Sequence, residues 1–175
     1  MAATAKSSSS KAAKARRTRR TGRRDPLAIA LLKKDHREVE GWFDEYEQLE
    51  DDAEKLALFN KIALALKVHT RIEEEIFYPE NRGEVEDDLM DEAYVEHDGA
   101  KKLIAEIEAM KPGEEFYDAK VKVLGEYIKH HVKEEEQPGG MFAQAKKGDE
   151  DLEAMGERLK ARKEELMAEL GEAAH

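Results

Sequence analysis

Apolar residues recur every three or four positions along most of the chain, which places them on one face of an α-helix. The first such stretch follows Asp25 and Pro26, which are typical of a helix cap and of the first helical position, and it extends to about Leu49. Four further amphipathic stretches cover about residues 54–78, 88–110, 114–136 and 150–170. The pattern therefore predicts an all-α protein.

The breaks between the first four stretches are short, and the second and third contain proline and glycine. Short connections predict helices that run antiparallel to their neighbours. Helices of this length would be about 35 Å long. We therefore expect an antiparallel up-down four-helix bundle. The fifth stretch is a charged helix with an apolar face, formed by Leu152, Met155, Leu159, Leu166 and Leu170. It has two possible partners, the bundle itself or another copy of the chain in a homo-oligomer.

Charge divides the chain near Asp25. Residues 1–24 contain nine Lys or Arg and no acidic residue, whereas the rest contains 21 basic and 41 acidic residues. The first segment also has a serine run and few large apolar side chains, so we predict a disordered basic tail over 1–24, a bundle over 25–145 and an amphipathic helix over 146–175. The tail could bind nucleic acid through phosphate contacts. The alternatives are a solubilising tail or a targeting segment.

The composition excludes several classes of protein. Because the chain has no cysteine, it cannot form disulfides, a thiolate zinc site or a cysteine nucleophile. Its apolar runs are shorter than the roughly 18 to 20 residues that a membrane span needs, and no secretory signal follows the basic start. We therefore expect a soluble protein of the cytoplasm that does not bind membranes.

Histidines and carboxylates point to a metal site in the bundle core. Each of the four predicted bundle helices has at least one histidine on or near its apolar face. At 100° per residue, His69 and Glu73 share the apolar stripe of the second helix, and His131 and Glu135 share that of the fourth. The candidate metal ligands are His36, His69, Glu73, His97, His131 and Glu135.

Two buried carboxylates that face one another cost several kcal/mol unless a cation lies between them. Each candidate in the first half of the bundle also has a counterpart 61 or 62 residues later in the second half. Two such halves supply four imidazoles and two bridging carboxylates, which suit two metal ions about 3.5 to 4 Å apart. Imidazole and carboxylate ligands favour iron, manganese or zinc without choosing between them. One alternative is that His130 and Glu134 replace His131 and Glu135, if the fourth helix widens locally by one residue.

Four segments between residues 25 and 142 resemble the hemerythrin-like HHE cation-binding domains: LLKKDHREVEGWFDEYE, HTRIEEEIFYP, EHDGAKKLI and HHVKEEEQPGGMF. The resemblance implies a four-helix bundle around a non-haem di-iron centre with an oxo or hydroxo bridge. It also implies that the four inward histidines are terminal ligands and that Glu73 and Glu135 bridge the two iron ions.

The sequence departs from the oxygen-carrying members of this family at one position. They have a further histidine one turn after the position of His97, and this chain has Lys101 there. The departure disfavours simple reversible oxygen carriage. We therefore predict a di-iron protein that binds, senses or processes dioxygen, peroxide or nitric oxide. The alternatives are an enzyme that decomposes peroxide or handles nitric oxide, and a nucleic-acid-associated protein that acts through its basic tail.

Other polar residues near the predicted site have two interpretations. We interpret Glu74, Glu75, Glu134 and Glu136 first as solvated helix-end carboxylates and second as groups around the metal site or its entrance. We interpret Tyr78, Tyr94 and Tyr127 first as core residues and second as radical or gate residues.

Overall fold

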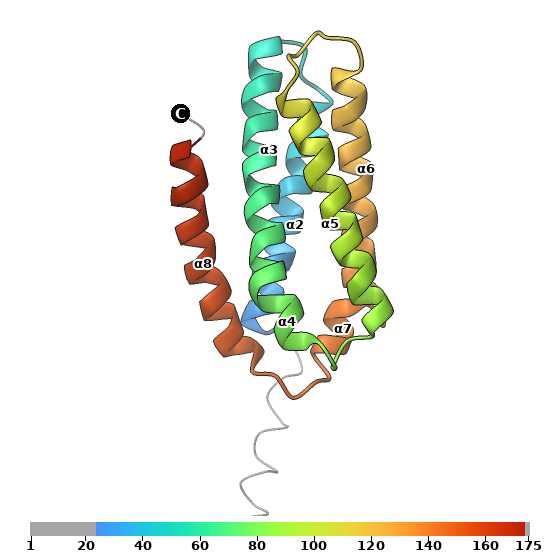
Figure 1. The fold of residues 1–175 in the computed structure, drawn as a ribbon, viewed down its shortest axis with the longest axis vertical. Coiled ribbons are helices and arrows are strands. Elements are labelled where there is room, and N and C mark those ends of the chain that lie inside the picture. The colour runs from blue at the N-terminus through green and yellow to red at the C-terminus, as the bar shows by residue number, and fades with distance from the viewer. Residues whose placement is uncertain (1–23, 174–175) are drawn as a thin grey trace, which may run out of the picture.

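The computed structural model describes residues 24–173 and is all-α (Figure 1). The predicted basic tail, apart from Arg24, lies outside the described residues. Four long helices lie side by side as an antiparallel bundle: α2 (Leu27–Tyr46), α3 (Asp52–Ile72), α5 (Asp87–Glu108) and α6 (Tyr117–Glu136). The predicted up-down four-helix bundle is therefore confirmed. The other elements are η1 (Glu73–Phe77), α4 (Tyr78–Asn81), α7 (Met141–Ala145) and α8 (Leu152–Ala173).

The helix ends differ from the sequence prediction by a few residues. The side chain of Asp51 caps α3 by accepting hydrogen bonds from the N–H groups of Ala53 and Glu54 at 2.9 and 3.0 Å. The predicted cap Asp25 does not cap α2, because its carboxylate pairs instead with Lys33 at 2.8 Å and with Lys146 at 3.0 Å. In addition, α2 ends three residues earlier than predicted and α6 begins three residues later.

The apolar core forms two clusters, with the histidines between them. On α2, Leu32 belongs to one cluster and Val39 to the other, and His36 lies between. On α3, Leu66 and Ile72 flank His69 in the same way. Polar side chains at this level are therefore enclosed above and below by packed apolar residues, where electrostatic interactions are strong.

The extra helix α8 packs against the outside of the bundle, alongside α2 and α3 (Figure 1). Its apolar face is buried in the same cluster as the start of α2, through Leu152, Met155, Leu159 and Leu166. The sequence left two possible partners for this helix, the bundle or another copy of the chain, and in the described structure it packs on the bundle. No helix in the described part of the chain is both long enough and apolar enough to cross a membrane.

Candidate metal centre

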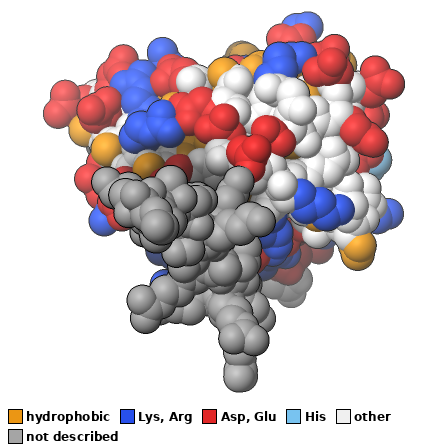
Figure 2. Space-filling model, turned by 90° about the horizontal axis from the view of Figure 1, so that it is seen from below, with side chains coloured by type: hydrophobic (Ala, Val, Ile, Leu, Met, Phe, Trp, Pro, Cys, Tyr) orange, Lys and Arg blue, Asp and Glu red, His pale blue; other side chains and the backbone are white. Residues whose placement is uncertain are grey.

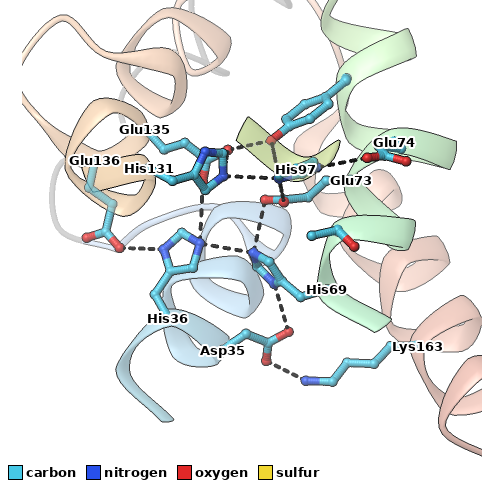
Figure 3. Close-up of polar contacts among 12 residues, drawn as sticks. Asp35, His36, His69, Glu73, Glu74, His97, His131, Glu135, Glu136 and Lys163 are labelled. Atoms are coloured by element: carbon cyan, nitrogen blue, oxygen red, sulfur yellow. Dashed lines mark hydrogen bonds and ion pairs between the residues drawn. The ribbon is translucent and has the colours of Figure 1, made fainter. Parts of the chain in front are cut away.

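All six predicted ligands lie at the same level of the bundle core, and none is more than 5% exposed (Figure 3). Their ligand atoms form two groups that share one carboxylate, and within each group these atoms lie within 4.8 Å of one another. The first group is His36, His69, Glu73 and Glu135, and the second is Glu73, His97 and His131. Side chains from all four bundle helices and from η1 therefore meet at one place.

The four imidazoles form two pairs. The Nε2 atoms of His36 and His69 lie 3.0 Å apart, and those of His97 and His131 lie 3.1 Å apart. The first pair comes from α2 and α3, and the second comes from α5 and α6. Each helical hairpin therefore contributes one imidazole pair, as the internal repeat of the sequence predicts.

The two buried carboxylates connect these pairs. One oxygen of Glu73 lies 3.2 Å from Nε2 of His69, and the other lies 3.3 Å from Nε2 of His97. Glu135 makes the same connection between the other two histidines, at 3.3 and 3.5 Å. Each carboxylate thus spans one histidine from each hairpin, which is the arrangement that two bridging ligands would have.

A widened helical turn directs the end of the second bundle helix into the site. In η1 the N–H of Tyr78 donates to the carbonyl of Glu73, five residues back. In a regular α-helix these two residues would be about 140° apart around the axis. The wider turn lets both side chains face the core, where each is fully buried.

The structure distinguishes the two alternatives for the fourth helix, because α6 stays α-helical throughout and does not widen. His131 and Glu135 point into the core. His130 is 60% exposed and pairs with Glu134 at 3.2 Å on the surface. The described structure thus brings the first pair into the cluster and leaves the second outside it.

Tyr78 makes polar contacts with the buried histidines and glutamates. The interpretation of this residue as core packing alone did not predict these contacts. Its hydroxyl donates to Glu135 at 3.0 Å and lies 3.1 Å from Nε2 of His97. Burial and then the nearby carboxylates raise its pKa well above the ordinary value, so the phenol keeps its proton. Tyr94 packs edge-on against its ring, but Tyr127 is exposed, so the core interpretation is wrong for Tyr127.

A second set of carboxylates orients the imidazoles from outside, and Figure 3 labels Asp35, Glu74 and Glu136 among them. Each Nδ1 faces one of them, so that each Nε2 points into the cluster, as in metal-bound histidines. The pairs are His36 with Glu136 at 2.7 Å, His69 with Asp35 at 3.4 Å, His97 with Glu74 at 3.0 Å and His131 with Glu96 at 2.7 Å.

The outer contacts correct our first interpretation of two glutamates. Glu74 and Glu136 are not solvated helix-end groups, because each accepts from an imidazole of the site. Glu75 does remain at the surface, where it pairs with Arg162 at 2.7 Å. The helical periodicity of the sequence did not predict Asp35 and Glu96 as partners of the imidazoles, although each directly precedes a predicted histidine ligand.

Charge in the metal-free cluster is balanced by protons. Burial would lower the pKa of His69, but Glu73 and Asp35 raise it to about 10. In the same way, carboxylate contacts outweigh burial and raise the pKa of His36 and of His97. Burial would raise the pKa of Glu73, but the neighbouring imidazoles hold it well below its usual range. The Glu73 carboxylate therefore stays ionised and attracts cations.

The residues fit a pair of metal ions. One buried oxygen on Glu73 and one on Glu135 have no hydrogen-bond partner within the described residues, so each is free to bind a cation. A cavity of about 20 Å³ adjoins the four imidazoles and has room for about one water-sized molecule. Its apolar wall consists of Val39, Leu66, Ile128 and Val132.

Lys101, which replaces the further histidine of oxygen carriers, does not enter the cluster. Its ammonium binds both oxygens of Glu74 at 2.5 and 2.6 Å, and its side chain is 41% exposed. Because Glu74 also accepts from His97, the lysine acts on the site only through this outer carboxylate. It therefore supplies no ligand atom to the buried cluster.

An all-α bundle that gathers buried histidines and glutamates at mid-height defines a class of cation-binding helical proteins. Residues 27–138 match the family model described as Hemerythrin HHE cation binding domain. The chain belongs to this family, and the resemblance inferred from its motifs is confirmed.

Two known proteins are similar to this chain. The crystal structure of a hemerythrin HHE cation binding domain-containing protein from Mycobacterium kansasii superposes with a TM-score of 0.67 and 24% identity, over 80% of this chain and 86% of that one. A protein named DNA nickase from Nostoc sp. is 28% identical over 143 residues, which are 81% of this chain. The chain spans only 40% of the length of that relative.

Proposed function

We propose that this chain is a cytoplasmic, non-haem di-iron protein that binds, senses or processes dioxygen or a reactive oxygen or nitrogen species. The observation that carries the proposal is the pair of buried carboxylates that each span two imidazoles from different hairpins. One imidazole pair would hold each iron ion, and Glu73 and Glu135 would bridge them. A hydroxo or oxo bridge would complete the centre.

The residues around the centre define what it could accept. Two bound iron ions would supply one electron each to a small oxygen or nitrogen species. The adjoining cavity has room only for a ligand of a few atoms, and four of its lining residues are apolar. Tyr78 holds a proton at its hydroxyl, within hydrogen-bond distance of Glu135, and can donate a hydrogen bond to a ligand there.

Metal analysis tests the proposed centre directly. Protein purified from its own host should contain two irons per chain, with an ultraviolet-visible band from the bridge that disappears on reduction. Glu135→Gln removes a bridging charge and should lower the iron content and weaken the band, whereas Glu126→Gln, on the exposed face of the same helix, should change neither. Two irons and an unchanged band in Glu135→Gln would contradict the assigned ligands.

Binding and turnover are separated by adding peroxide to the iron-containing protein. A binding or sensing protein should respond once per centre. The enzyme alternative requires oxygen release, or nitric oxide consumption, over many cycles. Tyr78 supports this alternative, because its buried hydroxyl keeps its proton and can donate a hydrogen bond to a reduced ligand beside Glu135.

A second candidate function, contact with nucleic acid, is supported by the nine basic residues within 1–24 and by the name of the Nostoc relative. On the end of the bundle seen in Figure 2, acidic and basic side chains are mixed among uncharged surface, and residues 25–175 hold 41 acidic against 21 basic residues. This proposal therefore rests on the tail. Deleting Met1 to Arg24 should abolish retention of DNA at low salt, and retention by the truncated chain would reject it. Nicking of supercoiled plasmid by both forms tests the activity itself.

A further inference from the structure

The four carboxylates that accept from the core histidines differ in their second partner, which lies on the side away from the histidine. Three are paired with a permanent cation: Asp35 with Lys163, Glu136 with Arg37 and Glu74 with Lys101. The fourth is Glu96, which has no lysine or arginine within ion-pair distance in the described part of the chain. Its neighbour on the solvent side is the imidazole of His130.

Glu96, His130 and Glu134 converge across the surface between α5 and α6. Nε2 of His130 lies 3.4 Å from Glu96 and 3.2 Å from Glu134, and one ligand atom from each residue lies within 4.8 Å of the other two. His130 and Glu134 are one turn apart on α6, and Glu96 faces them from α5. Two carboxylate oxygens and one imidazole nitrogen are thus already gathered.

The charge of this cluster is unbalanced. Glu96 and Glu134 are partly buried, with side-chain exposures of 12% and 22%, and Glu92 is close enough to Glu134 to add its negative charge. Within the described residues, the only basic side chains at ion-pair distance from these two carboxylates are the imidazoles of His130 and His131. At the three equivalent positions a lysine or arginine supplies a full positive charge.

We propose that Glu96, His130 and Glu134 form a separate, mononuclear site for a divalent first-row metal ion such as Zn²⁺. The bound ion supplies the positive charge that a lysine or arginine provides to the other outer carboxylates. Two carboxylates and one imidazole are suitable first-row ligands, and the exposed side leaves room for water in the remaining position.

The site is joined to the buried cluster by one side chain. One oxygen of Glu96 faces His130, and the other accepts the Nδ1–H of His131 at 2.7 Å. An ion on the outer oxygen therefore draws electron density away from the hydrogen bond that orients an inner imidazole. This coupling rests on the proposed di-iron function, whereas binding of the outer ion does not.

Zinc counting tests the outer site. The metal-free full-length protein is dialysed to equilibrium against Zn²⁺ alone, and bound zinc per chain is measured by elemental analysis. His130→Ala and Glu134→Gln should each lose one equivalent relative to the unmodified protein, because each removes a ligand from the surface without touching the core. Glu126→Gln, an exposed charge change on the same helix, should lose none.

The difference between variants is independent of the inner centre. If both sites bind zinc, the unmodified protein holds three equivalents and His130→Ala holds two; if the inner cluster binds none, the counts are one and zero. Equal zinc in the two proteins would overturn the outer site whatever the total. In iron-containing protein, zinc should also shift the visible band of the inner centre, but not in His130→Ala. An unshifted band with zinc bound would overturn the coupling.

Discussion

Each histidine in the core is held from two sides. A carboxylate accepts its Nδ1–H, which leaves Nε2 as the atom that points toward the partner imidazole and the bridging glutamate. Packing alone would restrict the orientation of a buried imidazole less than packing together with these two polar contacts does. The outer carboxylates therefore prearrange the nitrogen lone pairs, which lowers the conformational entropy that metal binding must overcome.

The raised pKa values predict how the metal-free protein responds to pH. A raised pKa in the folded state stabilises the fold fully below the unfolded pKa, near 6.5 for histidine, and this stabilisation is lost as pH rises through the folded value, about 10 for His69. Because Glu73 has a lowered pKa, its contribution is present above about 4.5 and is lost as pH falls through its folded value. The free energy of unfolding should therefore decrease from pH 6.5 toward 10.

Urea denaturation with a chelator present, at a series of pH values, measures this dependence. Glu73→Gln should flatten the alkaline decrease, because it removes the largest charge partner of His69. A free energy of unfolding that stays constant or increases between pH 6.5 and 10 would show that the buried imidazoles are neutral in the metal-free fold.

The hydroxyl of Tyr78 gives a second prediction at the scale of one residue. Tyr78→Phe removes the hydrogen bond to Glu135 and leaves a buried carboxylate oxygen without its donor. The metal-free protein should lose about 1–3 kcal/mol of stability. Tyr127→Phe, at an exposed tyrosine of α6, should change stability by less than about 0.5 kcal/mol. Equal midpoints of urea unfolding for the two variants would refute a structural role for the hydroxyl.

At the scale of elements, α8 is attached to the bundle by both packing and charge. Four of its apolar side chains are buried, and Arg158, Arg162 and Lys163 pair with Glu80, Glu75 and Asp35. The last pair reaches the site, because Asp35 also faces His69 (Figure 3). A helix outside the four-helix bundle therefore contributes the cation that balances an outer carboxylate.

Substitution by alanine at two glycines of α8 should change the stability of the protein in opposite directions. A Cβ at Gly156 would lie 2.6 Å from the backbone nitrogen of Ala28, so Gly156→Ala should push α8 away from α2 and cost about 1–3 kcal/mol. Nothing lies within 4 Å of a Cβ at Gly171, where alanine should stabilise the helix by up to about 1 kcal/mol. Thermal unfolding of both variants is the measurement, and a stabilised Gly156→Ala would mean that α8 does not pack this closely in solution.

At the scale of the whole molecule, the proposed centre joins all four bundle helices, so metal binding should stabilise the entire fold. An ion that binds only the folded state adds about 2.7 kcal/mol when its free concentration is one hundred times the dissociation constant. Anaerobic addition of ferrous iron should raise the unfolding temperature and release protons, since the imidazoles must become neutral to bind it. Glu73→Gln should show a smaller increase. No increase in the unmodified protein would contradict the proposed centre.

Much of the site could be predicted because its residues lie in phase with the core. His36, His69 and His131 occupy the same helix faces as their apolar neighbours, so the period that predicts the helices also places these residues inside. Tyr78 was not found as a member of the cluster because regular helix geometry turns it away from Glu73. The π-helical turn, which brings it in, has no clear signal in a single sequence.

The sequence by itself determined the helices, the bundle and which faces are buried, because hydrophobic periodicity is a local property that each segment carries independently. Only the tertiary structure decided that Glu73 and Glu135 each span two hairpins, that every inner histidine has an outer carboxylate, and that α8 supplies Lys163 to one of them. These pairings depend on how far each helix is rotated and shifted against its neighbours. Packing of the whole core sets those quantities, and no single segment of the chain contains them.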